Sequence, residues 1–255
     1  MNQTSYKAIF FDLDGTLLPM DLQEFLDSYM GSIGLFAAKK GMDTEAFQKG
    51  LQSGIKMMTT DDTKKCNADI FWDTFFAIVP EDRNQWIPLF AEFYENEFGL
   101  IGKGVRANPF VAKTIAVLKE KGYPVVLATM PMFPRRAVEW RCEWAGVDAA
   151  VFDRITTFEN STSVKPKLAY YKENLKAAGL QGEEVLMVGN NTKEDLACLQ
   201  LGMDAFLVTD HLINPNDFAI EEVKHGSFED FYAWVKNMPE CVHPAQNISD
   251  GLMGE

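Results

Sequence analysis

Two aspartates near the start of the chain have the residue type and spacing needed for metal-dependent chemistry. Asp12 and Asp14 follow a short apolar run at residues 8–11, which is typical of a buried strand. Because residues two apart in an extended chain point the same way, we expect both carboxylates to lie together where the strand ends, with Gly15 allowing a turn. Two crowded carboxylates repel each other unless a cation joins them, and their oxygens suit Mg²⁺. The spacing therefore predicts a Mg²⁺ site at the end of the first strand.

The segment that carries these aspartates reads AIFFDLDGTLL at residues 8–18. It resembles the first motif of the haloacid dehalogenase-like superfamily, a DxDGT signature directly after an N-terminal strand. The resemblance implies that Asp12 is a nucleophile and that Asp14 is a general acid and base. The alternative without chemistry is an Asp-Gly turn with a second acid beside it by chance.

Two later segments are similar to the second and third motifs of that superfamily. An apolar strand expected at residues 125–128 ends at Thr129, whose hydroxyl suits a phosphate oxygen, although Met130 follows where family members often carry asparagine. Lys165 precedes Pro166, a residue that favours the first turn of a helix. The resemblance implies that Lys165 neutralises the nucleophile and the phosphate. The alternative for Thr129 is a threonine that ends a strand without a chemical role, and the alternative for Lys165 is an exposed lysine in a loop.

The fourth motif is present with a substitution in LMVGNNTKEDL. The family pattern is a strand, a glycine and two acids about four residues apart, so two pairings are open: Asn190 with Glu194, or Asn191 with Asp195. In both, asparagine replaces the first acid, which leaves an oxygen ligand without charge and predicts weaker metal binding. The expected metal ligands are all oxygen donors: Asp12, Asp14 through its backbone carbonyl, Asn190, Asn191 and Asp195.

From residue 109 onward the chain alternates between helical and strand patterns. This alternation predicts an α/β fold, a Rossmann-like parallel sheet with helices on both faces, whose site forms at the carboxyl ends of the strands. The expected helices cover residues 111–121, 135–144, 168–178, 195–201 and 228–235, and the expected strands cover 125–128, 155–158, 185–188 and 205–208.

The alternation is absent between residues 21 and 103, where four helices are expected at 22–36, 44–54, 64–78 and 84–98. The last two carry aromatic stripes, which we interpret as packing between helices rather than as a ligand-stacking surface. An insertion at this point resembles the helical C1-type cap of the superfamily. The predicted organisation is a core of residues 1–20 and 104–237, a cap of 21–103, and a loosely ordered C-terminal tail of 238–255.

Composition narrows the possible partners. The chain has 255 residues, 47% of them hydrophobic, and a formal net charge of −13, which disfavours nucleic-acid binding. No apolar run approaches membrane-spanning length and the first residues lack a signal-peptide pattern, so we expect no membrane partner and a cytoplasmic location. The oligomeric state is left open.

The sequence thus predicts a Mg²⁺-dependent phosphomonoesterase that acts on a small phosphorylated metabolite through an aspartyl-phosphate. A phosphomutase of the same superfamily is the first alternative. A weakly active or non-catalytic binding protein is the second, because of the asparagines in the fourth motif. A dehalogenase is disfavoured, since the family's dehalogenases lack the second aspartate of the first motif.

Overall fold

The computed structural model describes residues 6–252 and contains one parallel sheet of six strands in the order β3-β2-β1-β4-β5-β6. The strands are β1 (Ala8–Phe11), β2 (Val125–Leu127), β3 (Arg154–Ile155), β4 (Val185–Gly189), β5 (Asp204–Val208) and β6 (Lys224–Gly226). The α-helices are α1 (Leu22–Lys39), α2 (Thr44–Thr60), α3 (Asn67–Phe76), α4 (Arg83–Asn96), α5 (Pro109–Glu120), α6 (Arg135–Trp144), α7 (Leu168–Ala178) and α8 (Phe228–Lys236).

The central strand β1 explains why the first motif begins with an unbroken apolar run. It pairs with β2 on one side and β4 on the other, and all four of its residues are fully buried. Side chains of Ile9 and Phe11 pack on one face of the sheet, and those of Ala8 and Phe10 pack on the other. A strand covered on both faces needs apolar residues at every position, not at alternate ones.

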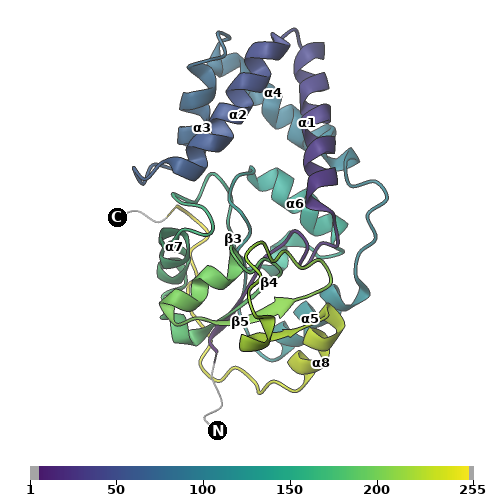
Figure 1. Cartoon of the computed structure of the whole chain (residues 1–255), viewed down its shortest axis with the longest axis vertical. Coiled ribbons are helices and arrows are strands. Elements are labelled where there is room, and N and C mark those ends of the chain that lie inside the picture. The colour runs from purple at the N-terminus through teal and green to yellow at the C-terminus, as the bar shows by residue number, and fades with distance from the viewer. Residues whose placement is uncertain (1–5, 253–255) are drawn as a thin grey trace.

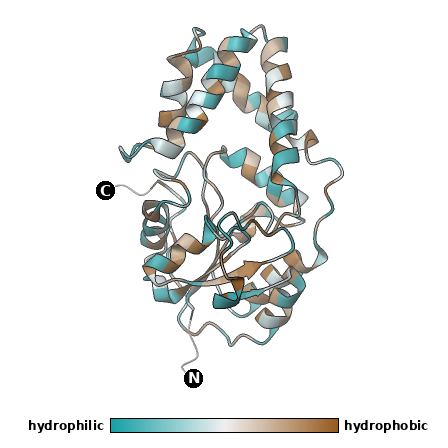
Figure 2. Ribbon diagram, in the orientation of Figure 1, coloured by the Kyte–Doolittle hydropathy of each residue, from teal (hydrophilic) through white to brown (hydrophobic). Residues whose placement is uncertain are grey.

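Helices cover both faces of this sheet, which confirms the predicted fold class. The face of Ile9 and Phe11 packs against α5, α6 and α8, and the opposite face packs against α7 and the short 3-10 helix at Asp195–Leu201. In Figure 2 the strand β5 is coloured as hydrophobic, while the helices mix hydrophilic and hydrophobic residues. This is the pattern of helices that bury one side against a sheet.

Helices α1 to α4 lie together above the carboxyl ends of the strands (Figure 1). They share an aromatic cluster of their own, which includes Phe47, Phe75 and Phe93. Three of these helices begin at aspartates whose side chains accept a hydrogen bond from a backbone N–H of the first turn: Asp21, Asp43 and Asp82. No helix in residues 6–252 is long and apolar enough to cross a membrane.

Several boundaries differ from the prediction for local physical reasons. Helix α3 begins at Asn67 rather than at residue 64, because Lys64 has a positive φ of 61° that a right-handed helix does not admit. Residues 195–201 form a 3-10 helix rather than an α-helix. Strand β3 is only two residues long and ends before residue 156. Strand β6, with the sequence KHG, is partly exposed and carries no apolar signal, so it was not predicted.

The C-terminal segment is docked, so the prediction of a loosely ordered tail is wrong for residues 238–252. The guanidinium of Arg154, which is fully buried, donates hydrogen bonds to the carbonyls of Ser249 and Gly251. The N–H of Ile155 donates to Asp250 Oδ1. The segment therefore covers the outer edge of β3, which would otherwise expose unpaired backbone groups. Residues 1–5 and 253–255, which belong to the predicted core and tail, lie outside the described range.

Candidate active site

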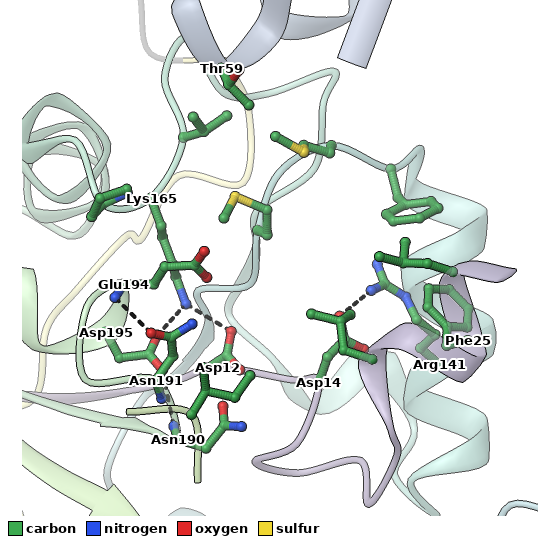
Figure 3. Close-up of a pocket in the computed structure, with 18 of the residues that line it drawn as sticks. Asp12, Asp14, Phe25, Thr59, Arg141, Lys165, Asn190, Asn191, Glu194 and Asp195 are labelled. Carbon is green, nitrogen blue, oxygen red and sulfur yellow. Dashed lines mark hydrogen bonds and ion pairs between the residues drawn. The ribbon is translucent and has the colours of Figure 1, made fainter. Parts of the chain in front are cut away.

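A cavity of about 420 Å³ lies at the carboxyl ends of the strands, between the core and helix α1 (Figure 3). Asp12 enters it from the end of β1, and Asn190 enters it from the end of β4. The predicted residues that line it are Asp12, Asp14, Lys165, Asn190, Asn191 and Asp195. The structure therefore brings segments that are far apart in the sequence to the edge of the sheet where parallel-sheet sites form.

Lys165 joins two buried carboxylates at the base of this cavity. Its Nζ donates to Asp12 Oδ1 at 2.8 Å and to Asp195 Oδ1 at 2.7 Å (Figure 3). Burial alone lowers the pKa of this ammonium group, but the charges of Asp12 and Asp195 raise it well above its usual range. Lys165 is therefore charged at neutral pH and lies against the carboxylate of Asp12.

Asn190 lies beside Asp12, and one hydroxyl connects their side chains. Thr16 Oγ1 lies 3.2 Å from Asp12 Oδ2 and 3.1 Å from Asn190 Oδ1. The amide of Asn190 donates from Nδ2 to the carbonyl of His211 at 2.6 Å, which fixes Oδ1 toward Asp12. Gly15 makes room for this amide, because a Cβ there would lie 2.2 Å from Asn190 Nδ2, and its φ is +81°.

The fourth motif follows neither of the two predicted pairings. Asn190 stands next to Asp12, and Asp195, five residues later, holds Lys165. Asp195 Oδ2 also accepts hydrogen bonds from the backbone N–H groups of Asn190 and Asn191, at 3.0 and 2.9 Å, so both of its oxygens are engaged.

The side chain of Asn191 forms hydrogen bonds within its own turn. Its Oδ1 accepts hydrogen bonds from the N–H groups of Lys193 and Glu194. An oxygen that already accepts two backbone hydrogen bonds is a poor candidate for a metal ligand, so the geometry favours Asn190 over Asn191. One sequence cannot distinguish the two, because both follow Gly189 within two residues.

Asp14 does not lie against Asp12, contrary to the expectation that the two carboxylates share one position. Asp14 Oδ2 accepts a 2.5 Å hydrogen bond from Arg141 Nη1, and Figure 3 shows Asp14 directed toward this arginine and away from Lys165. Burial raises the pKa of Asp14 above its usual range, and the charge of Arg141 opposes that shift. Both aspartates still line the same cavity.

Arg141 is a site residue that the sequence reasoning missed. Its side chain is only 1% exposed, and its guanidinium lies 4.6 Å from the ring centre of Phe133 and 5.9 Å from that of Phe25 in α1. The available signal was its position on α6, where it shares the buried side of the helix with Val138 and Cys142. A charged residue on an otherwise apolar helix face requires a buried partner.

Thr129 follows β2, as predicted, but it is not among the residues that line the cavity, whereas Met130 is. The register Phe11 opposite Leu127 places Thr129 beside the end of β1. Its hydroxyl is buried and has no hydrogen-bond partner within residues 6–252. Buried hydroxyls are normally satisfied, so this one keeps an unused hydrogen-bonding capacity at the strand ends.

Glu194 adds a titratable group to the wall of the cavity. Burial raises its pKa to about 7, with Lys165 opposing the shift and Asp195 reinforcing it. A carboxyl with this pKa changes its charge near neutral pH, so the total charge of the cavity depends on pH in that range.

The oxygen donors around Asp12 fit a hard divalent cation but supply little charge. Asp12 contributes a carboxylate, Asn190 contributes an amide oxygen, and the backbone carbonyl of Asp14 is the third expected donor. Within residues 6–252 no three His, Cys, Asp or Glu side chains are grouped as a metal site. Such a group of acids is not formed around Asp12, because Asn190 stands where the superfamily motif has an acid and the side chain of Asp14 is directed toward Arg141.

The chain is similar to known hydrolases in sequence and in fold. A family model described as haloacid dehalogenase-like hydrolase matches residues 6–202. The chain is 26% identical to a glyceraldehyde 3-phosphate phosphatase of Methanothermobacter thermautotrophicus, over 81% of this chain and 87% of that protein. It is 29% identical to a phosphoglycolate phosphatase of Haemophilus influenzae, over 76% and 81%. A HAD phosphatase structure from Thermococcus onnurineus has a TM-score of 0.55 at 17% identity, covering 92% of this chain and 99% of that one.

Proposed function

Because this chain belongs to the haloacid dehalogenase-like hydrolases, we propose that it is a Mg²⁺-dependent phosphomonoesterase that uses Asp12 as its nucleophile. The observation that carries the proposal is Lys165, which holds Asp12 and Asp195 at the base of a cavity large enough for a phosphorylated metabolite. The relatives named as phosphatases support the same reaction class.

The first chemical step is in-line attack by a carboxylate oxygen of Asp12 on phosphorus. A phosphorus–oxygen bond forms to Asp12, and the bond to the ester oxygen of the substrate breaks. The departing oxygen takes a proton from Asp14. In the second step Asp14 takes a proton from water, whose oxygen attacks phosphorus and releases inorganic phosphate and the Asp12 carboxylate.

The surrounding groups prepare these steps. Lys165 donates a hydrogen bond to Asp12 and offers positive charge to the phosphoryl oxygens, and the Thr129 hydroxyl offers a hydrogen bond. Burial, by raising the pKa of Asp14, favours the protonated form that a general acid needs, and Arg141 holds that carboxyl until a leaving group competes for it.

The metal would be held by oxygen ligands of Asp12, the Asp14 backbone carbonyl and Asn190. When bound, Mg²⁺ supplies positive charge that stabilises the phosphoryl oxygens in the transition state. A single carboxylate among the ligands implies weak binding in the absence of substrate.

The direct test is Asp12→Asn with p-nitrophenyl phosphate and Mg²⁺. We expect hydrolysis to fall to background, and intact-mass spectrometry of the acid-quenched wild-type enzyme to show a phosphoryl adduct that the variant lacks. Asp27→Asn, at an exposed position of α1, is the matched control and retains full activity. Wild-type rates in Asp12→Asn would disprove the mechanism.

The non-catalytic binding protein is a second candidate, and the neutral Asn190 beside Asp12 favours it. It predicts phosphate-ester binding without turnover even in excess Mg²⁺. A phosphomutase would instead pass the phosphoryl group from Asp12 to a second hydroxyl compound, so phosphate release would be low relative to phosphoenzyme formation.

A further inference from the structure

A second cavity, of about 210 Å³, lies inside the helical insertion next to the active-site cavity. Residues from α1 to α4 form most of its wall, among them Ile33, Leu51, Phe75 and Phe90. The two cavities share three lining residues, Leu26, Met132 and Phe133. The aromatic stripes of this region therefore surround a cavity as well as packing the helices together.

Resting on the phosphatase function proposed above, we propose that the substrate is a phosphate monoester of an apolar alcohol, with an alkyl or aryl group that occupies this second cavity. The phosphoryl group then lies at Asp12 and Lys165, and the ester oxygen lies between the two cavities.

The chemistry of the lining supports an apolar occupant. Among the residues that the structure describes, 6–252, no charged side chain lines the second cavity, and the hydroxyls of Tyr29 and Tyr94 are hydrogen-bonded to each other at 2.8 Å. Burial raises the pKa of Tyr29 to about 12, so this pair stays neutral. A carboxylate or a polyol placed here would lose its hydration without gaining partners.

The volume sets the size of the group. A hydrocarbon-lined cavity of about 150 Å³ stays dry and binds benzene. A cavity of about 210 Å³ accommodates an aromatic ring with a short chain, or an alkyl chain of similar volume. Cavities of this size lower the stability of apolar cores, so helix packing alone does not explain why these helices retain one.

The connection between the cavities is also apolar. The loop after β2 reads Met130-Pro131-Met132-Phe133, and its first, third and fourth side chains line the active-site cavity. The Met132 side chain, which is flexible, contributes to both cavities and can adapt to a chain that passes between them. Met130, directly after Thr129, extends this apolar wall.

The test is a homologous series of n-alkyl phosphates from methyl to octyl, together with benzyl phosphate, assayed with Mg²⁺. Since burial of one methylene is worth about 0.8 kcal/mol, kcat/KM is expected to rise about fourfold for each added methylene until the cavity is filled. Ile55 lines the second cavity but not the first, and it is half-buried against the aromatic cluster, so we replace it by both a larger and a smaller residue. Ile55→Trp should shorten the preferred chain, and Ile55→Ala should lengthen it.

The control is Leu35→Trp, because Leu35 is 65% exposed on α1 and lines neither cavity. It should leave both the chain-length profile and the rate with methyl phosphate unchanged. Binding is measured separately by titrating benzyl phosphate into the wild-type protein and following tryptophan fluorescence, with Trp72→Phe identifying the response of the cavity residue.

A flat chain-length profile that neither Ile55 variant changes would overturn the inference while leaving the phosphatase proposal intact. Loss of all turnover, with every ester, would instead contradict the phosphatase proposal. In that case the titration decides: binding that strengthens from methyl to benzyl phosphate supports the apolar site, and equal or undetectable binding of both rejects it.

Discussion

Replacing Asn190 with aspartate should strengthen Mg²⁺ binding and, at the same time, weaken the metal-free fold. Asn190 is buried, its Oδ1 lies beside Asp12 across the Thr16 hydroxyl, and its Nδ2 donates to the carbonyl of His211 at 2.6 Å. Aspartate places a second oxygen where Nδ2 was. That oxygen faces a carbonyl with no hydrogen to share, and the new charge faces Asp12.

The two effects have opposite signs and comparable sizes. A buried acceptor left without a donor costs about 1–3 kcal/mol, which lowers the melting temperature of a chain of this length by roughly 2–12 °C without metal. A unit charge about 4 Å from a cation is worth up to about 4 kcal/mol per cation charge at an effective dielectric of 20. Part of this attraction is offset by the repulsion between the new carboxylate and Asp12. We therefore expect a Mg²⁺ affinity at least about tenfold higher than in the wild type.

Differential scanning fluorimetry across a Mg²⁺ titration measures both effects. Asn190→Asp should melt below the wild type without metal and gain more from Mg²⁺, by about 3–6 °C for each tenfold rise in affinity at saturation. Asn191→Asp is the matched control, because the Asn191 side chain accepts hydrogen bonds only from its own turn. This variant should change neither the metal-free melting temperature nor the Mg²⁺ affinity appreciably. If Asn191→Asp tightens Mg²⁺ binding and Asn190→Asp does not, our assignment of the metal position is wrong.

Two further predictions concern buried charge. Arg141→Met removes the partner of Asp14 and should lower the free energy of unfolding by about 3–5 kcal/mol at pH 8, measured by urea titration. In this variant the pKa of Asp14 in the folded state is raised further, because the charge of Arg141 no longer lowers it. Protonation of Asp14 toward pH 5 then removes the uncompensated charge, so the loss of stability should be smaller there. An equal loss at both pH values would contradict this ion pair. Glu194 has a folded-state pKa of about 7 against an ordinary value of 4.5, so the folded state binds more protons and its stability falls as pH rises between these values. Glu194→Gln should reduce that slope, to which the raised pKa values of Asp14 and Asp195 also contribute, and an unchanged slope would show that Glu194 is not one of its sources.

The parts of the fold that were predicted correctly are those with strong local signals. The fully apolar strand β1 and the helix boundary glycines, such as Gly179 with its φ of 65°, are set by the residues that form them. The C-terminal segment was not predictable in this way. Its order depends on the guanidinium of Arg154, about 95 positions earlier, whose partners are backbone carbonyls that any sequence would provide.

The same distinction applies to the candidate site. Asp12, Lys165 and Asp195 were singled out because their segments resemble motifs of the superfamily. The structure joins the three residues through hydrogen bonds of 2.8 and 2.7 Å from Lys165 Nζ, although Asp195 was expected as a metal ligand. The direction of Asp14 could not be found, because it is decided by Arg141 on a distant helix. The alternation of side chains in a strand does not extend past its end, where tertiary ion pairs determine orientation.

The ion pairs of Lys165 and Arg141 also explain how the active-site cavity combines charged side chains at its base, the floor, with apolar side chains along its wall. Lys165 lies between Asp12 and Asp195, Arg141 pairs with Asp14, and the neutral Asn190 adds no further charge, so two cations face three carboxylates and these groups keep about one negative charge before any ligand enters. A phosphate group then brings negative charge that the protein has not already compensated. A divalent cation at Asp12 and Asn190 would supply that compensation, which makes binding of the metal and of the phosphate mutually dependent. The apolar part of the substrate, in contrast, needs only the second cavity, and its contribution to binding should therefore be independent of Mg²⁺.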